Sequence, residues 1–435
     1  MASVQVIKTT PPGYSPIYNT VEIAVLETDA ASLAQPNYKY IFEVTVTNVV
    51  SGNVTQTFNV SPEPKQNFGI QDISGFLDQY VKEALPEPTD ADYVNAMYKV
   101  QPDSIIEYEI TCTSGWNDSA GIFTVDPDGV GTITTGKLLA WSASFEEHDW
   151  IEQMNEATPF DTWLCSVANG VNANFLTSFP NKDVQLLDVG WTYFLSETPS
   201  DIDRARIETF DSSGVSIAVF EISGPTVAGL AIDHLTRMAS APASLNLIIP
   251  GQIISGAQPI ITSSVAYYEM QLFNNAAAPA SELITMTLQT PCRYETYRIH
   301  FLNRLGGFDA YNFTLRSQPT RDTKRKSFTK SDNNLDLNGI RYDHKDNGTV
   351  DYNVTTRNKI KLRSDYLTEE ENDWLQELVD SPTVYLEFTK LKGGRDFKSV
   401  RVTTNKWTQK KTSIDKLFRL DIDIDLGLEN KRQTK

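Results

Sequence analysis

Residues 38–46 read Tyr-Lys-Tyr-Ile-Phe-Glu-Val-Thr-Val, a stretch in which apolar and polar side chains alternate. A period of two is typical of a β-strand with one buried and one exposed face. Residues 49–55 then supply a turn rich in Ser, Gly and Asn, followed by the start of a return strand. The two segments together predict an antiparallel hairpin.

The same pattern recurs along the chain between Gly, Pro, Asn, Asp and Ser residues. Further strands are predicted at residues 105–113, 121–125, 184–187, 191–195, 206–210, 215–220, 245–249, 266–273, 283–288, 294–302 and 310–316. Closely spaced short strands are typical of β-sandwiches, and a hydrophobic fraction of 40% is enough for buried cores. We therefore expect a mainly β, multi-domain fold with antiparallel β-sandwich-like domains, a few short helices and a small α+β C-terminal domain.

Two helices are predicted. Residues 72–81 place five apolar side chains on one helical face, and Asp72 can cap the first turn, although Ser and Gly residues near the start weaken the pattern. The clearer helix covers residues 368–379, because Thr368 and Glu371 form a capping-box pair and a Ser-Pro pair follows the last turn. Strands predicted around this second helix complete the C-terminal domain: 384–388, 400–404 and 416–426.

A chain of 435 residues corresponds to roughly two to four domains. We expect an N-terminal β-sandwich-like domain at 1–140 and one or more central β-rich domains at 141–318. A basic linker or arm at 319–334, poor in apolar residues, would then lead to the C-terminal α+β domain at 335–435.

Charge is unevenly distributed. Residues 1–290 carry 10 Lys and Arg against 34 Asp and Glu, a net charge of −24, whereas residues 291–435 carry 28 and 22, a net charge of +6. Such polarity is typical of an oriented assembly in which one end meets an acidic partner. The alternative is that acidity keeps the larger part soluble, and the sequence favours neither.

The chain has no apolar run of about 18 residues and does not begin with a basic segment followed by an apolar one. We therefore expect no membrane helix and no secretory signal, in a soluble protein assembled inside a cell. The three cysteines, Cys112, Cys165 and Cys292, form no Cys-x-x-Cys pair and are predicted to be buried thiols.

No motif for nucleophilic catalysis, zinc-dependent hydrolysis or phosphate binding occurs. The acidic clusters at 146–149 and 126–129 are weak candidates for metal sites. In the first cluster, side chains of adjacent residues do not point at one centre. The second cluster is typical of a turn. The four histidines are interpreted as surface or interface residues: His148, His234, His300 and His344. We predict no catalytic residue, no cofactor and no metal site, and hence no enzyme.

Two charged segments are candidate interaction sites. One is an acidic row on a single face of the strand predicted at 416–426: Asp421, Asp423 and Asp425. We favour a solvent- or partner-facing row over a Mg²⁺ site, because no second acidic or lysine element is evident. The other is basic: Arg321, Lys324, Arg325 and Lys326. The net negative charge of the protein opposes sequence-independent binding to DNA. We therefore expect these residues to form a basic arm that docks on an acidic neighbouring protein.

Residues 297–313 read Tyr-Arg-Ile-His-Phe-Leu-Asn-Arg-Leu-Gly-Gly-Phe-Asp-Ala-Tyr-Asn-Phe, and Gly306-Gly307 is predicted to form a turn between strands with aromatic cross-strand contacts. The segment resembles a Leu-Asn-x-x-Gly-Gly-x-Asp-x-Tyr-x-Phe hairpin in virion structural proteins of tailed phages and prophages of Bacteroides- and Flavobacterium-like bacteria. Further segments are similar to the same group, in the same order: 40–44 with 72–74, 174–180, 362–375, 410–418 and 430–433.

The resemblance implies a structural component of a tailed bacteriophage virion, in the tail, baseplate or head–tail connector ring, assembled in the bacterial host cytoplasm. It offers no catalytic residues. We expect the partners to be other copies, in a ring or symmetric oligomer, and other virion proteins, with no membrane and no sequence-specific nucleic acid.

Two other classes of function remain open. One is a carbohydrate- or receptor-binding β-sandwich module of a phage tail or surface protein, which would stack exposed tryptophans on a host-surface glycan. The available tryptophans are Trp116, Trp141, Trp150, Trp163 and Trp191. The other is an enzyme that holds a metal ion on the carboxylates of residues 421–425.

Overall fold

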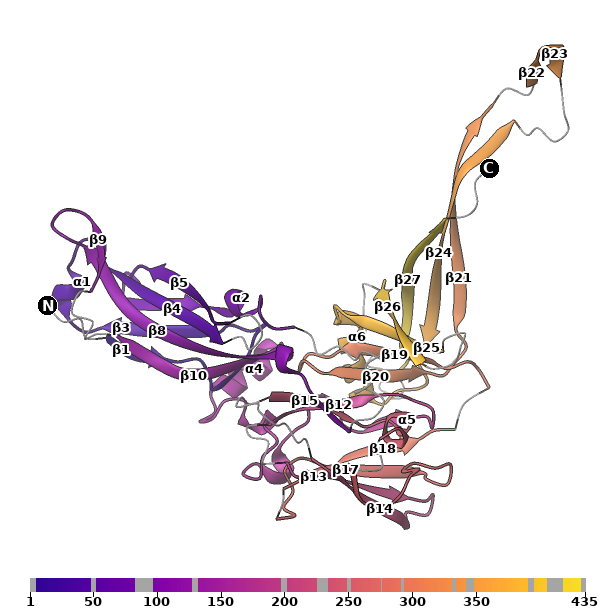
Figure 1. Ribbon diagram of the computed structural model, residues 1–435, viewed down its shortest axis with the longest axis horizontal. Coiled ribbons are helices and arrows are strands. Elements are labelled where there is room, and N and C mark those ends of the chain that lie inside the picture. Colours follow the sequence, from indigo (N-terminus) through magenta and orange to yellow (C-terminus); the bar gives the residue numbers. More distant parts are fainter. Residues whose placement is uncertain are drawn as a thin grey trace. The chain divides into compact units, whose positions relative to one another are not determined.

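A computed structural model describes residues 5–47, 52–82, 97–126, 132–196, 202–224, 234–248, 252–274, 276–290, 293–330, 334–341, 348–389, 395–404 and 418–431. The chain divides into two compact units. Unit 1 comprises Met1–Gln289 and Leu302–Asp309, and unit 2 comprises Thr290–Phe301 and Ala310–Lys435. The fold is mainly β, as predicted (Figure 1).

The first part of unit 1 is a sandwich of two sheets. A three-stranded sheet has the order β1-β3-β6, and the other sheet has the order β2-β10-β8-β4-β5, with β9 paired to β8. The elements are β1 (Gln5–Thr9), β2 (Tyr14–Pro16), β3 (Glu22–Glu27), α1 (Ala30–Leu33), β4 (Lys39–Thr47), β5 (Val54–Val60), β6 (Phe68–Asp72), α2 (Ser74–Leu77), β8 (Ile105–Asn117), β9 (Phe123–Val125) and β10 (Ile133–Trp141).

The predicted hairpin is present as β4 and β5, with Val46 opposite Val54. Alternate residues of β4 enter the core between the sheets, where Tyr40, Phe42 and Val44 are all fully buried. The Tyr40 hydroxyl accepts a hydrogen bond from the Glu27 backbone N–H at 2.8 Å and donates one to the Asn67 carbonyl at 2.6 Å. Burial of this large ring is therefore compatible with a satisfied polar end.

The second part of unit 1 contains a six-stranded sheet, β11-β18-β17-β13-β14-β16, and a three-stranded sheet, β12-β15-β7. Its elements are β7 (Tyr98–Val100), η1 (Pro102–Ser104), α4 (Glu147–Met154), η2 (Asp161–Trp163), η3 (Gly170–Asn172), β11 (Lys182–Val184), β12 (Trp191–Ser196), β13 (Arg204–Phe210), β14 (Ser216–Ser223), β15 (His234–Ala239), α5 (Pro242–Asn246), β16 (Ile253–Ser255), β17 (Tyr267–Phe273) and β18 (Ile284–Leu288).

The predicted boundaries after residues 140 and 318 differ from the division into two units. Strand β7 belongs to the predicted N-terminal domain, yet it pairs with β15 through Lys99 opposite Arg237. Sheet pairing therefore joins the predicted first and second domains within unit 1. The segment 319–334 is predicted to be a basic linker or arm, and its residues up to Thr329 lie in the exposed strand β21 of unit 2.

Three predictions of secondary structure were wrong. The strand expected at 184–187 overlaps β11 only at Val184, and residues 186 and 187 form a turn. The strand expected at 245–249 overlaps helix α5, which begins with Pro242 directly after an extended Ala241. A short apolar run cannot by itself distinguish a strand from a buried helical turn, and proline is well suited to the first helical position. The helix expected at 72–81 is only the four-residue α2, because Ser74 and Gly75 are poor helix formers.

Unit 2 contains a seven-stranded sheet with the order β20-β19-β25-β26-β27-β24-β21, and a two-stranded β22-β23 hairpin. Its elements are β19 (Tyr297–Leu302), β20 (Phe308–Phe313), β21 (Gln318–Thr329), β22 (Asn334–Asp336), β23 (Gly339–Arg341), β24 (Thr349–Arg363), α6 (Glu369–Asp380), β25 (Val384–Thr389), β26 (Arg395–Val402) and β27 (Asp421–Lys431). The last residues of β19 and the first of β20 fall in unit 1.

Helix α6 confirms the prediction from the capping box. The Thr368 hydroxyl accepts a hydrogen bond from the Glu371 N–H at 3.2 Å, and the Glu371 carboxylate accepts one from the Thr368 N–H at 2.8 Å. The buried face of α6 contributes Trp374, whose ring lies 5.7 Å from that of Phe301 and 6.2 Å from that of Tyr311. These contacts form part of the core of unit 2.

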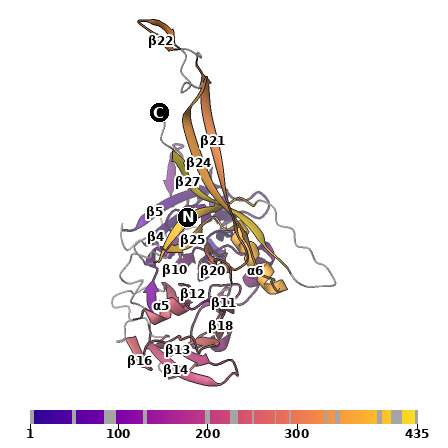
Figure 2. The same cartoon turned by 90° about the vertical axis from the view of Figure 1, so that its right-hand side faces the viewer.

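Strands β21 and β24 leave the sheet of unit 2 as a long antiparallel pair (Figures 1 and 2). Strand β21 pairs with β24 from Thr349 to Lys361, whereas β27 pairs with β24 only from Thr355 to Arg363. From Thr349 to Val354, β24 therefore has β21 as its only neighbour among the described strands. We call the pair β21–β24 the ribbon.

Candidate interaction surface and buried polar networks

The predicted basic residues lie on β21, the edge strand of the seven-stranded sheet. All twelve residues of β21 are exposed. Alternation along the strand places Lys324 and Lys326 on one face of the ribbon, and Arg321 and Arg325 on the other. The structure thus gathers the four side chains on one exposed edge.

On one face of this edge the arginines contact polar or acidic side chains, whereas on the other face the lysines form no ion pair among the described residues. Arg321 donates from Nε to the Asn358 side-chain oxygen at 3.1 Å, and Arg325 Nη1 lies 3.0 Å from Asp351 Oδ2. Lys324 and Lys326 make no ion pair with any residue that the structure describes. Their ammonium groups therefore remain accessible to an acidic partner.

The predicted acidic row lies on β27, next to basic side chains of β24. Register places Asp421, Asp423 and Asp425 opposite Arg363, Lys361 and Lys359. Asp421 Oδ2 lies 3.6 Å from Arg363 Nε and 3.7 Å from Lys361 Nζ, and Arg357 Nη1 lies 3.9 Å from Asp425 Oδ2. These cross-strand charges complement one another within the sheet. The strand alternation of the three aspartates is present, and Asp421 and Asp423 are exposed as expected, but Asp425 is only 9% exposed. Their basic counterpart was not predicted, although residues 357–363 alternate Arg and Lys with other residues.

A further ion pair links the two strands of the ribbon. Lys359 Nζ lies 2.7 Å from Asp322 Oδ2. The hydrogen bond and charge of Lys359 lower the pKa of Asp322, and the same contact raises the pKa of Lys359. Both groups are solvent-exposed, so we treat this pair as a contact that sets register and not as a large source of stability.

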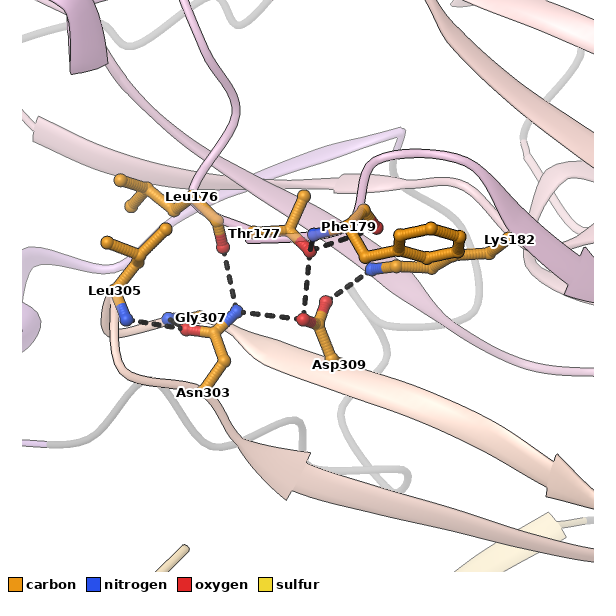
Figure 3. A network of polar contacts seen from close by, with 8 residues as sticks. All are labelled: Leu176, Thr177, Phe179, Lys182, Asn303, Leu305, Gly307 and Asp309. Atoms are coloured by element: carbon orange, nitrogen blue, oxygen red, sulfur yellow. Dashed lines mark hydrogen bonds and ion pairs between the residues drawn. The ribbon is translucent and has the colours of Figure 1, made fainter. Parts of the chain in front are cut away.

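A buried network surrounds the turn between β19 and β20 (Figure 3). The Asn303 side-chain oxygen accepts hydrogen bonds from the Leu305 and Gly307 N–H groups at 3.0 and 2.9 Å, and its amide donates to the Leu176 carbonyl at 2.8 Å. The amide also donates to Asp309 at 3.2 Å. Asn303 thus closes the turn and fixes it to a neighbouring loop.

Asp309 completes the network from the other side of the turn. Its carboxylate accepts a hydrogen bond from the Thr177 hydroxyl at 2.9 Å and forms an ion pair with Lys182, whose side chain is also buried (Figure 3). Because two ions removed from water need both attraction and hydrogen bonds to offset desolvation, this arrangement makes the carboxylate costly to replace. Thr177, Asn303 and Asp309 lie in the segments that carry the resemblance, but their polar contacts, and the part played by Lys182, were not predicted from the sequence.

The turn requires two glycines because backbone carbonyl groups of other loops lie where a side chain would be. Gly306 has φ +88°, and a Cβ atom there would lie 1.9 Å from the Ser142 carbonyl oxygen. A Cβ atom at Gly307 would lie 2.9 Å from the Leu176 carbonyl oxygen. The Asn-x-x-Gly-Gly-x-Asp pattern in the resembling segment therefore has a physical basis: two side chains close the turn and two glycines let it pack.

A second buried cluster lies in unit 2. Glu387 on β25 has a fully buried side chain, and its Oε2 lies 3.1 Å from His300 Nε2 and 3.5 Å from Arg298 Nε. Arg395 Nη1 on β26 lies 2.8 Å from Oε1. Burial raises the pKa of Glu387, but the hydrogen bond and charge of His300 and the charges of the two arginines outweigh it and lower the pKa below its ordinary value of 4.5.

The position of His300 corrects one prediction. This residue was interpreted as a surface or interface histidine, but it is 1% exposed and its ring packs 4.7 Å from that of Phe397. His148 is exposed, as expected, and lies 3.4 Å from Glu152 on the same helix. The side chain of His234 and all of His344 lie outside the described residues.

The cysteines and the acidic clusters considered as metal sites form no reactive site among the described residues. Cys112 and Cys165 are buried thiols, as predicted, and burial raises the pKa of both, that of Cys112 to about 12; Cys292 lies outside the described residues. Residues 146–149 lie at the start of α4, while 127–129 are not described. Among the described residues, no three His, Cys, Asp or Glu side chains are placed to hold a metal ion. No described helix is long and apolar enough to cross a membrane.

The five tryptophans proposed for glycan stacking are all buried or partly buried. Trp141 is fully buried, and its Nε1–H donates to the Leu305 carbonyl at 3.2 Å. Trp191 is 6% exposed, and the Arg237 guanidinium lies 5.3 Å from the centre of its ring. Trp150 stacks on Phe160 with ring centres 5.5 Å apart. These rings therefore serve packing within unit 1.

No protein-family model matches this sequence, and no curated protein is similar to it. Among solved structures, squid arrestin aligns with 67% of this chain and 95% of its own, at 9% identity and a TM-score of 0.17. The full extracellular region of plexin A4 aligns with 98% of this chain at 8% identity and a TM-score of 0.17, and the chain spans 34% of that structure. Likeness at this level carries no argument about fold or function.

Proposed function

We propose that this chain is a structural component of a tailed-phage virion, located in the tail, baseplate or head–tail connector, and acts by assembling with copies of itself and with other virion proteins. The observation that supports it most is the ribbon, because a long exposed edge strand with accessible cations is suited to protein–protein contact. The resemblance at residues 297–313 supplies the virion context.

The buried networks support a mechanical function. In unit 1, Asn303 and Asp309 fix a turn against neighbouring loops, and in unit 2, Glu387 joins three strands through its ion pairs. Interactions of this kind favour one well-defined arrangement of strands. We infer that the protein performs no catalysis and that the polar side chains of these clusters maintain the surfaces used in assembly.

Imaging of the purified full-length chain tests the proposal. We expect negative-stain micrographs to show rings or other closed symmetric particles, with a matching oligomer mass in sedimentation. Mass spectrometry of purified phage particles that encode the chain should detect it as a stoichiometric component. A chain that stays monomeric at every concentration and is missing from particles would contradict the proposal.

The glycan-binding alternative has less support, because none of the five tryptophans forms an exposed platform. A glycan array with the full-length chain separates the two functions. Specific glycan binding by a chain that does not assemble would favour the alternative.

A further inference from the structure

We propose that the β21 edge of the ribbon docks on the acidic surface of unit 1 in a second copy of this chain. The inference rests on the proposed assembly function and names the surface and the partner through which copies meet. It assigns the contact to Lys324 and Lys326, with Arg321 and Arg325 on the opposite face of the same strand.

Charge complementarity identifies the partner. Residues 318–363, which contain the ribbon, carry 11 Lys and Arg against 6 Asp and Glu, a net charge of +5. Unit 1 carries 11 Lys and Arg against 35 Asp and Glu, a net charge of −24. A second copy therefore supplies a strongly acidic surface for every basic ribbon, and opposite charges steer association and select register.

The distribution of charge within unit 2 identifies the edge. On β24, Arg357, Lys361 and Arg363 already face the carboxylates of β27. On β21, Lys324 and Lys326 lie on the far side of β24 from β27 and have no ion pair among the described residues. The accessible positive charge of the ribbon therefore lies on β21, at Lys324 and Lys326.

Like charges exclude the simplest alternative, in which two ribbons pair edge to edge. Such a dimer would bring Lys324 and Lys326 of each copy toward the same side chains of the other, and lysine-rich edges are known to prevent this pairing. Docking of the ribbon on unit 1 instead joins two different surfaces. A contact of that kind produces a ring when the rotation closes, in agreement with the proposed assembly.

Exposed apolar side chains favour a protein partner over nucleic acid. Phe328 is 50% and Tyr352 is 53% exposed, and their rings lie 6.2 Å apart near the end of the ribbon. Between the two ribbon strands in the chain, Leu337 is fully exposed and Ile340 is 56% exposed. Exposed aromatic and aliphatic groups beside cations are typical of protein interfaces.

The first test reverses the edge charge in the full-length chain with K324E/K326E. We expect the dissociation constant for self-association, measured by sedimentation at low salt, to rise at least about tenfold relative to wild type. The control, R293E/R316E, makes the same change in net charge at two exposed arginines of unit 2 outside the ribbon and should change the dissociation constant less than about twofold. Circular dichroism checks that both variants fold.

The second test locates the contact. Equal amounts of ¹⁴N- and ¹⁵N-labelled wild-type chains are mixed and treated with a carbodiimide, which joins a lysine directly to a contacting carboxylate. We expect mixed-isotope crosslinks from Lys324 or Lys326 to Asp or Glu residues of unit 1. Crosslinks confined to one isotope would show docking within a single copy and would overturn the proposal.

The outcomes separate this inference from the proposed function. If wild type assembles and K324E/K326E assembles equally well, the ribbon is not the contact, while the assembly function stands. If wild type stays monomeric at every concentration, this inference fails, and the proposed function fails as well when the chain is also missing from phage particles. If the ribbon lysines instead control binding to a 30-base-pair DNA duplex in fluorescence anisotropy and self-association is unchanged, nucleic acid is the occupant and the inference is wrong.

Discussion

At the scale of single residues, the structure explains why particular side chains occur where they do. Gly306 is needed because its φ is +88° and the Ser142 carbonyl occupies the space of a side chain. Glu387 is needed because two arginines and a histidine converge on it in a buried site. Each feature gives a substitution with a defined expected effect.

Gly306→Ala should destabilise unit 1 by about 2–4 kcal/mol, because the methyl group clashes with backbone and the left-handed conformation disfavours any L side chain. Urea unfolding measures the change. The matched control is Gly75→Ala in α2, where a Cβ atom meets nothing within 4 Å, and this change should be neutral or slightly stabilising. Equal stability of the two variants would show that the turn can relax.

Glu387→Gln should destabilise unit 2 by about 3 kcal/mol near neutral pH, because it leaves buried cations without their counter-ion. Since the folded-state pKa of Glu387 lies below the ordinary value of 4.5, its stabilising effect is complete above that value and is lost as the pH falls through the folded pKa. The difference between wild type and variant should therefore shrink as the pH is lowered from above 4.5 through the folded-state pKa.

Urea titrations at several pH values test this dependence, with exposed Glu370→Gln as the control. The control should leave the unfolding midpoint nearly unchanged at each pH. A wild-type advantage over Glu387→Gln that stays constant down to the lowest pH would contradict the assigned ionisation.

At the scale of elements, some helices and strands are specified by local sequence and others by the strands with which they pair. The start of α6 is set locally, by the capping box of Thr368 and Glu371. The ribbon depends on partners, because β21 has no buried residue of its own and pairs with β24 over twelve positions. Strand β24 in turn buries Ile360 and Leu362 in the sheet that it shares with Ile422 and Ile424 of β27.

Thr368→Ala should cost about 1 kcal/mol, because the Glu371 N–H loses its side-chain acceptor. Hydrogen exchange should become faster in the first turn of α6 and change little in its last turn. Thr368→Ser keeps the hydroxyl and should stay within a few tenths of a kcal/mol of wild type. A serine variant as unstable as the alanine variant would show that the methyl group, and not the cap, is important.

At the scale of the whole molecule, charge polarity is the dominant feature. Unit 1 is strongly acidic, and the basic residues gather in unit 2, where only part of them face carboxylates of the same sheet. Electrostatic attraction between copies should therefore contribute to assembly and should respond to salt.

Raising the ionic strength from about 0.05 to about 0.5 M shortens the Debye length from roughly 14 to roughly 4 Å, so self-association of wild type should weaken. Sedimentation over this range measures the slope. The K324E/K326E variant should show a flatter dependence, because part of the screened attraction is already gone. Assembly that strengthens with salt would instead indicate a mainly apolar contact.

Features that depend on neighbours in the chain follow from the amino-acid sequence alone. Alternation at 38–46 was sufficient for strand β4, and Thr368 with Glu371 located the start of α6. The strand expected at 416–426 begins only at Asp421, as β27, with Ile422 and Ile424 buried as expected, and residues 416 and 417 lie outside the described residues. Both patterns act within a few residues, where side-chain direction and backbone hydrogen bonds follow directly from spacing.

Contacts between residues that are distant in the sequence depend on the three-dimensional fold. Asp309 finds Lys182, Glu387 finds His300, and the carboxylates of β27 face the cations of β24. Spacing in the sequence carries no information about strand order, so the acidic row could be predicted without its partners. Tertiary structure likewise left the lysines of β21 exposed, because the sheet ends there and no described strand covers that edge.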